Sequence, residues 1–322
     1  MSVVFISALA PHLYGFLKFK NALGIKYASS SHYLKSFDRY NHANGNNCAL
    51  VKNIVEGWVA KLELMSTSQD RSFLPPIREF GRYLASIGQE DAYILSDSYR
   101  MQRYHAGVYV MSELEIEAFF NACDTITCNG NRPGRPYVLP ALYRFMYCCG
   151  IRCGEARNLK CGDVHLADGY VDILQSKAYR DRRLFLSDEL VEYLNKYESK
   201  ITRHFPSREY FFPSPMGGKY SASPISSNFR KIWLSAGLSR DGDIKPRAYD
   251  FRHHFACANI IRWSKAGLDT HAMLPYLMRY MGHTSLESTY YYLHLAPDFF
   301  PQYSLLASST EILIPEVEED EI

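Results

Sequence analysis

Apolar residues in the first hundred positions recur at the three- and four-residue spacing of amphipathic helices. Four such stretches, separated by polar turns, centre on residues 13–17, 34–40, 51–59 and 77–87. The last follows a Pro-Pro pair, and proline is favoured in the first turn of a helix. The pattern predicts a small amino-terminal helical bundle. A bundle of this kind suits DNA binding, protein binding or neither, and its pattern alone does not decide.

The helical periodicity is lost over residues 97–110, where we place the interdomain linker. The amino-terminal domain is therefore expected to cover residues 1–105. Ser112 and Glu115 have capping-box spacing, so a helix is predicted to begin after Ser112. A second apolar helix is expected from about residue 139 to residue 149, where a glycine follows.

Between residues 168 and 187 the pattern changes to strand, turn and strand. Gly169-Tyr-Val-Asp-Ile-Leu and Leu184-Phe-Leu are the two apolar stretches, and the polar turn between them contains Lys177. From Val191 onwards helical patterns return. We expect a mainly α chain with a small antiparallel β-sheet or hairpin.

The length of 322 residues favours two domains of ordinary size. The formal net charge is +2, but six acidic residues and no basic ones fall within residues 311–322. Removing those six negative charges leaves residues 1–310 with a net charge of +8. A body of that charge suits a polyanionic partner without requiring one.

Neither a membrane nor a metal site is indicated. No apolar stretch reaches the about 18 residues that span a bilayer, and the apolar start lacks the basic region of a signal peptide. We therefore expect a cytosolic protein with reduced thiols. Residues 148–161 contain four of the eight cysteines but no paired Cys-x-x-Cys knuckle, so core packing is favoured over zinc binding.

Four short segments contain the residues that point to chemistry. In the first, Gly150-Ile-Arg152-Cys-Gly-Glu155, an arginine directly follows a glycine turn at an expected helix start. There its guanidinium and the backbone donors can face the same anion. Glu155 could orient Arg152, although such a pair taken alone is more often a surface ion pair. The second segment is the turn with Lys177, followed five and six residues later by Arg182 and Arg183.

The third and fourth segments lie near the carboxyl end of the predicted helical region. The third, Pro246-Arg-Ala-Tyr249-Asp-Phe-Arg252-His-His-Phe255, is predicted to open a helix. The fourth is Tyr280-Met-Gly-His283-Thr-Ser-Leu-Glu-Ser-Thr-Tyr-Tyr-Tyr292-Leu-His294. Its Thr and Glu after His283 have capping-box spacing, so a helix is expected to begin directly after His283. Any one segment alone is weak evidence.

In this order and spacing the four segments resemble the conserved boxes of the tyrosine recombinase (phage integrase) family. That pattern is Gly-x-Arg-x-x-Glu, a hairpin Lys, His-x-x-Arg, and Gly-His with a tyrosine nine residues after the His. The resemblance covers residues 110–295. It implies a helical, SAM-like core-binding domain over residues 1–105, a catalytic domain over residues 106–298 and a tail over residues 299–322. The matching residues are Arg152, Lys177, Arg252, His283 and Tyr292.

The resemblance implies that Tyr292 attacks a DNA phosphodiester, leaving a 3′-phosphotyrosyl link and a free 5′-hydroxyl. Arg152 and Arg252 would clamp the phosphate, because their rigid guanidinium forks match its oxygens. Lys177 would protonate the leaving oxygen, and His283 would donate to the phosphate or handle a proton. Because one phosphoester replaces another, no nucleotide cofactor is expected, and no metal either.

Tyr249 is the departure from the family pattern, since a histidine is usual there. Tyrosine can donate a hydrogen bond to a phosphate oxygen but cannot be a cation. A packing residue with no catalytic part is an equal alternative. Tyr290 and Tyr291 precede Tyr292 directly, but on a helix they point elsewhere.

The resemblance also implies partners and a biological role. The partners are double-stranded DNA at specific sites, three further copies in a homo-tetramer on synapsed DNA, and accessory proteins, in the nucleoid of a bacterial cytoplasm. We expect the integrase or transposase of a mobile element. The alternatives are Xer-type chromosome or plasmid dimer resolution, a type IB topoisomerase-like enzyme, and a DNA-binding protein without catalysis. Residues 299–314 are expected to dock on a neighbouring protomer, and the acidic end alone to be a solubilising extension.

Overall fold

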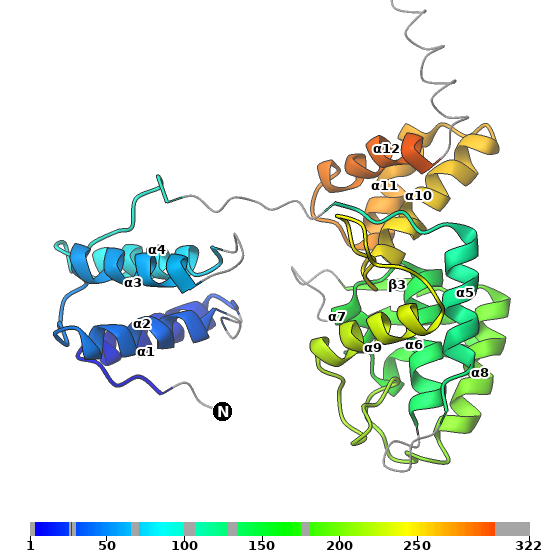
Figure 1. Ribbon diagram of the computed structural model, residues 1–322, viewed down its shortest axis with the longest axis horizontal. Coiled ribbons are helices and arrows are strands. Elements are labelled where there is room, and N and C mark those ends of the chain that lie inside the picture. Colours follow the sequence, from blue (N-terminus) through cyan, green and yellow to red (C-terminus); the bar gives the residue numbers. More distant parts are fainter. Residues whose placement is uncertain are drawn as a thin grey trace, which may run out of the picture. The chain divides into compact units, whose positions relative to one another are not determined.

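The computed structural model describes residues 4–25, 27, 30–65, 71–99, 107–127, 134–174 and 181–299, the last six as backbone alone. It divides into two compact units, Met1–Ala106 and Gly107–Ile322 (Figure 1). Half of the expected linker (residues 100–106), Lys177 and the tail beyond residue 299 lie outside the described residues.

The amino-terminal unit contains the four expected helices. They are α1 (Ala10–Ala22), α2 (Ser31–Ala43), α3 (Lys52–Met65) and α4 (Leu74–Ser86). Large aromatic side chains fill the space between them, and each is at most 1% exposed. Phe37 of α2 meets Trp58 of α3 edge-on at 5.5 Å, and Phe16 of α1 lies 5.6 Å from Phe80 of α4. The apolar spacing therefore marked the faces that form this core.

The second unit is also mainly helical. Its α-helices are α5 (Glu113–Asp124), α6 (Arg135–Cys149), α7 (Cys153–Ala156), α8 (Asp188–Ile201), α9 (Ala222–Ser235), α10 (Asp250–Lys265), α11 (Thr270–Met281) and α12 (Glu287–Phe299). One hydrophobic core is shared by α5, α6, α8, α9, the sheet and the start of α10. A smaller core joins the rest of α10 to α11 and α12 through Ile260, Leu274 and Leu277. The smaller core fixes the helix that contains Tyr292.

A three-stranded antiparallel sheet of order β1-β2-β3 lies in this unit. Its strands are β1 (Val164–His165), β2 (Tyr170–Ile173) and β3 (Arg182–Phe185). Val171 pairs with Leu184, and both side chains are buried. The hairpin of β2 and β3 was predicted. The short β1 was not, because two residues give no periodicity.

The ends of the helices explain how the chain turns toward the site. Ser112 and Glu115 form the predicted capping box at the start of α5. α6 ends at Gly150, which has a left-handed backbone (φ 57°). A Cβ at Gly150 would lie 2.3 Å from Cδ1 of Phe255, so glycine is needed for the conformation and for the close approach of α10. The expectation for α12 was wrong, because that helix begins at Glu287 rather than directly after His283, with the N–H of Tyr290 bonded to the carbonyl of Leu286.

Among the described residues, no helix is long and apolar enough to cross a membrane. Within the same part of the chain, no group of three His, Cys, Asp or Glu side chains could hold a metal ion. Cys149 is buried in the larger core, whereas Cys148 is exposed and Cys153 and Cys161 are partly buried. Core packing therefore accounts for only part of the cysteine-rich stretch.

Candidate active site

Arg152 lies immediately before α7, directly after the glycine turn. Its backbone N–H donates to Oε2 of Glu155 at 3.0 Å, and its Nη1 donates to Oε1 at 2.9 Å. Nη2 donates to the carbonyl oxygen of Gly282, 130 residues later in the sequence, at 2.8 Å. Glu155 therefore orients Arg152, and the guanidinium joins α7 to the end of α11.

Arg182, the first residue of β3, shares the same glutamate. Its Nη1 and Nη2 donate to Oε1 and Oε2 of Glu155 at 3.1 and 2.8 Å, and its Nε donates to the Tyr280 carbonyl at 2.6 Å. Burial alone would raise the pKa of the Glu155 carboxyl. The hydrogen bonds and charge of Arg182, with those of Arg152, lower that pKa below its usual value. One ionised carboxylate thus serves two arginines.

Gly282 ends α11 in the left-handed conformation, with φ 65°. A Cβ at this position would lie 2.9 Å from Nη1 of Arg182 and 3.4 Å from Nη1 of Arg152. The turn before His283 is therefore glycine both because of its backbone angles and because two guanidinium groups approach it closely.

Arg252 lies in the first turn of α10 and is 1% exposed. Nη1 donates to the Gly150 carbonyl at 2.8 Å, and Nη2 donates to the Met281 carbonyl at 2.7 Å. Nη2 also lies 2.8 Å from Nε2 of His283. Within the described ranges, Nε has no acceptor and no ion pair includes Arg252. Burial and the neighbouring charge of Arg152 lower the pKa of its guanidinium.

His283 is held at both ring nitrogens. A guanidinium can only donate, so Nε2 of His283 accepts from Arg252 and the ring proton sits on Nδ1. Nδ1 then donates to Oγ1 of Thr289 at 2.8 Å. Burial, followed by the charges of Arg252 and Arg152, lowers the pKa of His283 to about 3. The imidazole is therefore neutral at physiological pH.

Tyr292 is buried, with 3% of its surface exposed. Its ring stacks on His283 at 5.9 Å, with 14° between the planes, and lies 5.6 Å from the ring of His253. Burial raises the pKa of its phenol, and the charge of Arg252 opposes that shift. Tyr290 and Tyr291 are 40% and 41% exposed, so they point elsewhere on the helix, as expected.

Tyr249 lies at the rim of this cluster, just before α10, and is 42% exposed. Its ring meets His253 edge-on at 5.0 Å. His253 is buried, and burial followed by the charges of Arg247 and Arg252 lowers its pKa to about 4. Four of the six expected site residues thus converge, Tyr249 is adjacent, and Lys177 lies outside the described residues.

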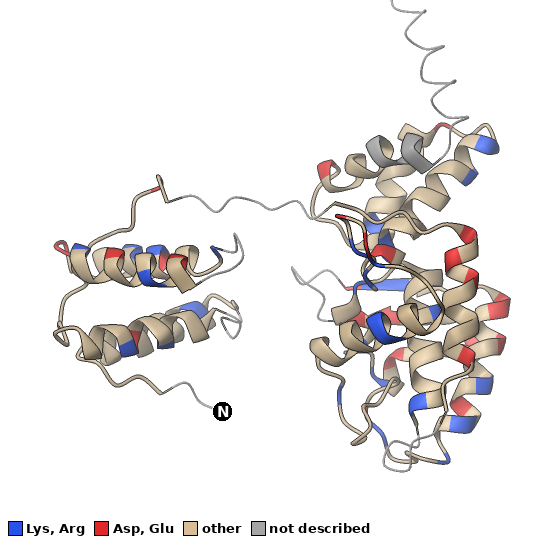
Figure 2. Cartoon of the chain, in the orientation of Figure 1, with Lys and Arg blue, Asp and Glu red and all other residues tan. Residues whose placement is uncertain are grey.

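A cleft of about 1150 Å³ opens beside the turn between α11 and α12. Its walls come from the start of β3 and from α11, and the lining residues are Asp181, Arg182, Arg183, Pro275, Tyr276, Met278, Arg279, Tyr280, Gly282 and His283. Acidic residues are frequent along α5 and α8 (Figure 2), and Asp181 also lines the cleft. Arg182 and His283 are the residues of the cluster that line this open cleft, together with the basic Arg183 and Arg279.

Residues 110–298, more than half of the chain, match the sequence model of the phage integrase family. The chain belongs to the phage integrase family. The resemblance of the four segments is thereby confirmed, and the cluster around Arg252 lies within the matched residues of the integrase fold.

Curated relatives agree over most of the integrase chain. A protein of Sinorhizobium fredii, y4rB, which is named as a candidate integrase/recombinase, is 25% identical over 292 residues, which cover 89% of this chain and 93% of that protein. The tyrosine recombinase XerD of Pseudomonas putida is 25% identical over 231 residues, or 70% of each chain. The alignment with y4rB is long enough to include residues of both units.

Solved structures show the same fold at lower identity. The XerH site-specific recombinase in a post-cleavage complex with its difH substrate superposes with a TM-score of 0.60 and 20% identity, over 90% of this chain and 82% of that one. A lambda integrase tetramer bound to a Holliday junction gives 0.59 and 16%, over 89% and 78%. The chain therefore shares the tyrosine recombinase fold with both of these structures.

Three integrase residues of this site were not assigned from the sequence. Thr289, in the fourth segment, holds the His283 ring. His253, in the third segment, packs between Tyr249 and Tyr292. Arg182 was noted as a basic residue after the hairpin turn, without the carboxylate that it shares. The one available signal was the spacing of Arg182 from Lys177.

Proposed function

We propose that this protein is a site-specific DNA recombinase that cuts and rejoins DNA through a covalent link to Tyr292. The environment of Arg252 is the observation that supports this proposal most directly. A buried guanidinium without a carboxylate partner among the described residues is an uncompensated charge, which is costly unless an anion binds. The scissile phosphate would satisfy both the charge and the free Nε–H. A residue that served only for packing would not need a buried charge or a free N–H donor.

Arg152 and Arg252 would hold the two non-bridging oxygens of the phosphate. Both are fixed by backbone carbonyls, so a bound phosphate would need to displace only the contact of Arg252 with His283. Tyr292, stacked on His283, would attack the phosphorus. Its phenol is protonated at neutral pH, so a proton must leave during attack.

His283 is the proposed acceptor of that proton. It is neutral, and its acceptor nitrogen Nε2 becomes available when Arg252 turns its N–H groups toward a phosphate. Of the two roles expected for His283, handling a proton thus has more support than donating to the phosphate. Lys177 remains the proposed acid for the leaving 5′-oxygen, and Tyr249 a donor at the rim.

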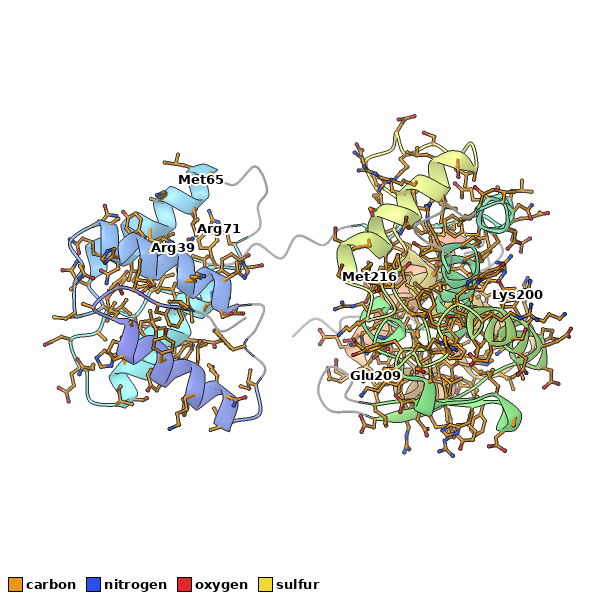
Figure 3. All side chains as sticks on the ribbon, turned by 90° about the horizontal axis from the view of Figure 1, so that it is seen from below. Arg39, Met65, Arg71, Lys200, Glu209 and Met216 are labelled. Carbon is orange, nitrogen blue, oxygen red and sulfur yellow. The ribbon has the colours of Figure 1, made fainter. Side chains whose placement is uncertain are left out.

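The amino-terminal unit would supply a second contact with DNA. A groove of about 520 Å³ lies between α2 and α3, and its lining includes Lys35, Arg39 and Lys61 but no acidic residue. Arg39 and Met65, on these two helices, are labelled in Figure 3. Cations arranged along two helices are suited to phosphate oxygens. We therefore assign DNA contact to this face.

Integration or transposition of a mobile element is the role we propose, with a homo-tetramer acting on two synapsed DNA sites. The similarity to y4rB, a candidate integrase/recombinase over nearly its whole length, favours this role. XerD and XerH keep dimer resolution open as the second candidate. A nucleoid-associated, cytoplasmic location would follow from either role.

The test is covalent trapping on DNA that flanks the gene in its host. Tiled duplexes with single nicks would be incubated with the protein in excess EDTA, then denatured and separated by size. We expect a protein–DNA adduct with the unaltered protein and with Tyr291→Phe, and none with Tyr292→Phe, which should still bind DNA. Retardation without an adduct would support a DNA-binding protein instead. Rescue of an EDTA-inhibited reaction by magnesium would contradict the mechanism.

A further inference from the structure

The strand that follows the Lys177 turn is tied to the phosphate clamp by one residue. Arg182 is the first residue of β3, and its guanidinium makes three hydrogen bonds to two different elements. Only 7% of its side chain is exposed. Its neighbour Arg183 is 49% exposed and pairs with Asp172 on the adjacent strand. The two arginines thus have different environments although they are adjacent in sequence.

We propose that Arg182 is a positioning residue for DNA cleavage, acting through Glu155 on Arg152 and through the Tyr280 carbonyl on the Gly282–His283 turn. This inference rests on the proposed function. Arg182 does not need to touch DNA for it. It holds the second guanidinium of the clamp and the histidine in one arrangement.

The contacts explain why a guanidinium is required. Glu155 accepts from Nη1 and Nη2 while Nε reaches the Tyr280 carbonyl, so three donors of one planar group point in fixed directions. A lysine ammonium at this position would keep the charge but could not span the carboxylate and the carbonyl together.

The contacts also explain how replacing the Arg182 side chain would disturb Arg152 and His283. Glu155 bonds both the backbone N–H and Nη1 of Arg152, so a carboxylate released by Arg182 could rotate and take Arg152 with it. At the other end, Arg182 lies where a Cβ at Gly282 would be 2.9 Å away, so it packs directly on the turn that precedes His283. A shift of about 1 Å in such groups can slow chemistry about 10²-fold.

Arg182 also joins the hairpin to the clamp. The turn with Lys177 leads directly into Arg182, five residues later. Anchoring the start of β3 to α7 and α11 places the exit of the hairpin turn beside the site.

The rate of adduct formation tests the proposal, with Arg183→Met as the matched control. With saturating protein on the nicked duplex, Arg182→Met should slow the adduct about 10²-fold, and Arg182→Lys nearly as much. The dissociation constant for DNA should change less than about threefold for both. Arg183→Met should keep the unaltered rate. Equal rates for Arg182→Met and Arg183→Met would overturn the proposal.

A double variant separates positioning from an independent role. If Arg182 acts through Arg152, then Arg152→Lys with Arg182→Met should be about as slow as the slower single variant. Losses that multiply would mean that Arg182 does not act through Glu155 on Arg152, and that part of the proposal would be wrong. Arg182→Met with Glu155→Gln, which leaves no unpaired carboxylate, replaces Arg182→Met if that variant does not fold.

A measurement on the protein alone keeps this inference distinct from the proposed function. NMR titration of the His283 ring, assigned by its loss in His283→Asn, reports the arrangement around that histidine. Its pKa should stay near 3 with Arg183→Met and rise toward the usual value with Arg182→Met, because the released turn would lose part of its burial and its closeness to Arg252 and Arg152, which lower this pKa more than the charge of Arg182 does. An unchanged pKa with Arg182→Met would overturn the positioning role, whether or not the protein cleaves DNA.

Discussion

Nη2 of Arg252 lies 2.8 Å from Nε2 of His283, and this contact determines which ring nitrogen of the histidine carries the proton. Arginine keeps its protons, so the histidine must present a lone pair. The imidazole is consequently neutral, and its remaining proton points at Thr289. His283, which was expected to act on a phosphate, is therefore bonded to Arg252, the arginine that would bind that phosphate.

Thr289→Val should weaken this arrangement. The threonine is fully buried, and valine has the same shape but no acceptor for Nδ1 of His283. We expect a loss of about 1–3 kcal/mol in the free energy of unfolding, because a buried donor is left without a partner. Chemical denaturation measures this, with Thr284→Val as the control on the same segment. Equal stabilities would mean that the bond contributes nothing.

Arg252→Lys should slow adduct formation at least about 10²-fold, comparable to the loss of one transition-state donor. Lysine keeps the charge but cannot bond the Gly150 and Met281 carbonyls and also reach a phosphate. Arg262→Lys, in the last turn of the same helix, is the matched control. Single-turnover trapping compares them. A rate within a few fold of the unaltered protein would exclude Arg252 from the clamp.

Tyr249→Phe should slow cleavage roughly tenfold without changing stability. A partly exposed hydroxyl at the rim of the cluster has no buried packing to lose, and one lost hydrogen bond corresponds to about 1.4 kcal/mol at most. Tyr290→Phe, similarly exposed on α12, serves as the control. The rate and the melting temperature are measured together. No change in rate would leave Tyr249 as a packing residue against His253.

Acid should destabilise the protein through its buried histidines. The pKa values of His253 and His283 are about 4 and about 3 in the folded chain, below their ordinary 6.5. Between pH 6.5 and about 4 the unfolded chain therefore binds protons that the folded chain excludes, so stability falls as pH falls. Each histidine contributes up to about 1.4 kcal/mol per pH unit. Denaturation at pH 7 and pH 5 should show a smaller loss for His253→Gln, and an equal loss would contradict this account.

Removal of residues 299–322 should impair synapsis and strand exchange more than binding to a single site. The expected cause is the loss of apolar residues that dock on a neighbouring protomer. Removal of 315–322 alone should keep recombination and tighten non-specific DNA binding, because repelling charges are lost but no phosphate contact is. Recombination assays and gel shifts compare the two deletions. Full activity of the longer deletion would make the tail a passive extension.

The sequence was sufficient for the elements and for the residues with a chemical signature. Helical spacing located the cores of the amino-terminal helices, and the capping box located the start of α5. The start of α12 was misplaced because Thr284 and Glu287 have capping-box spacing that the structure does not use. A spacing rule cannot tell which of several small polar residues will end a turn.

The support of the site could not be predicted in the same way. Arg152 and Arg252 are bonded to the carbonyls of Gly282, Gly150 and Met281, and backbone carbonyls have no sequence signature. Their positions depend on how α6 and α11 end, which is a matter of tertiary packing. For the same reason, the role of Arg182 could be inferred only once its contacts with Glu155 and the Tyr280 carbonyl were known.

The carbonyls at the ends of α6 and α11 also determine what can be altered. Main-chain oxygens persist through almost any side-chain exchange, so a protein engineer could randomise much of the lining around the two arginines. Besides Glu155, Arg182 and His283, the exceptions are Gly150 and Gly282, since any side chain there collides with Phe255 or with the guanidinium groups. Libraries for retargeting this protein should hold these positions constant and place their diversity elsewhere.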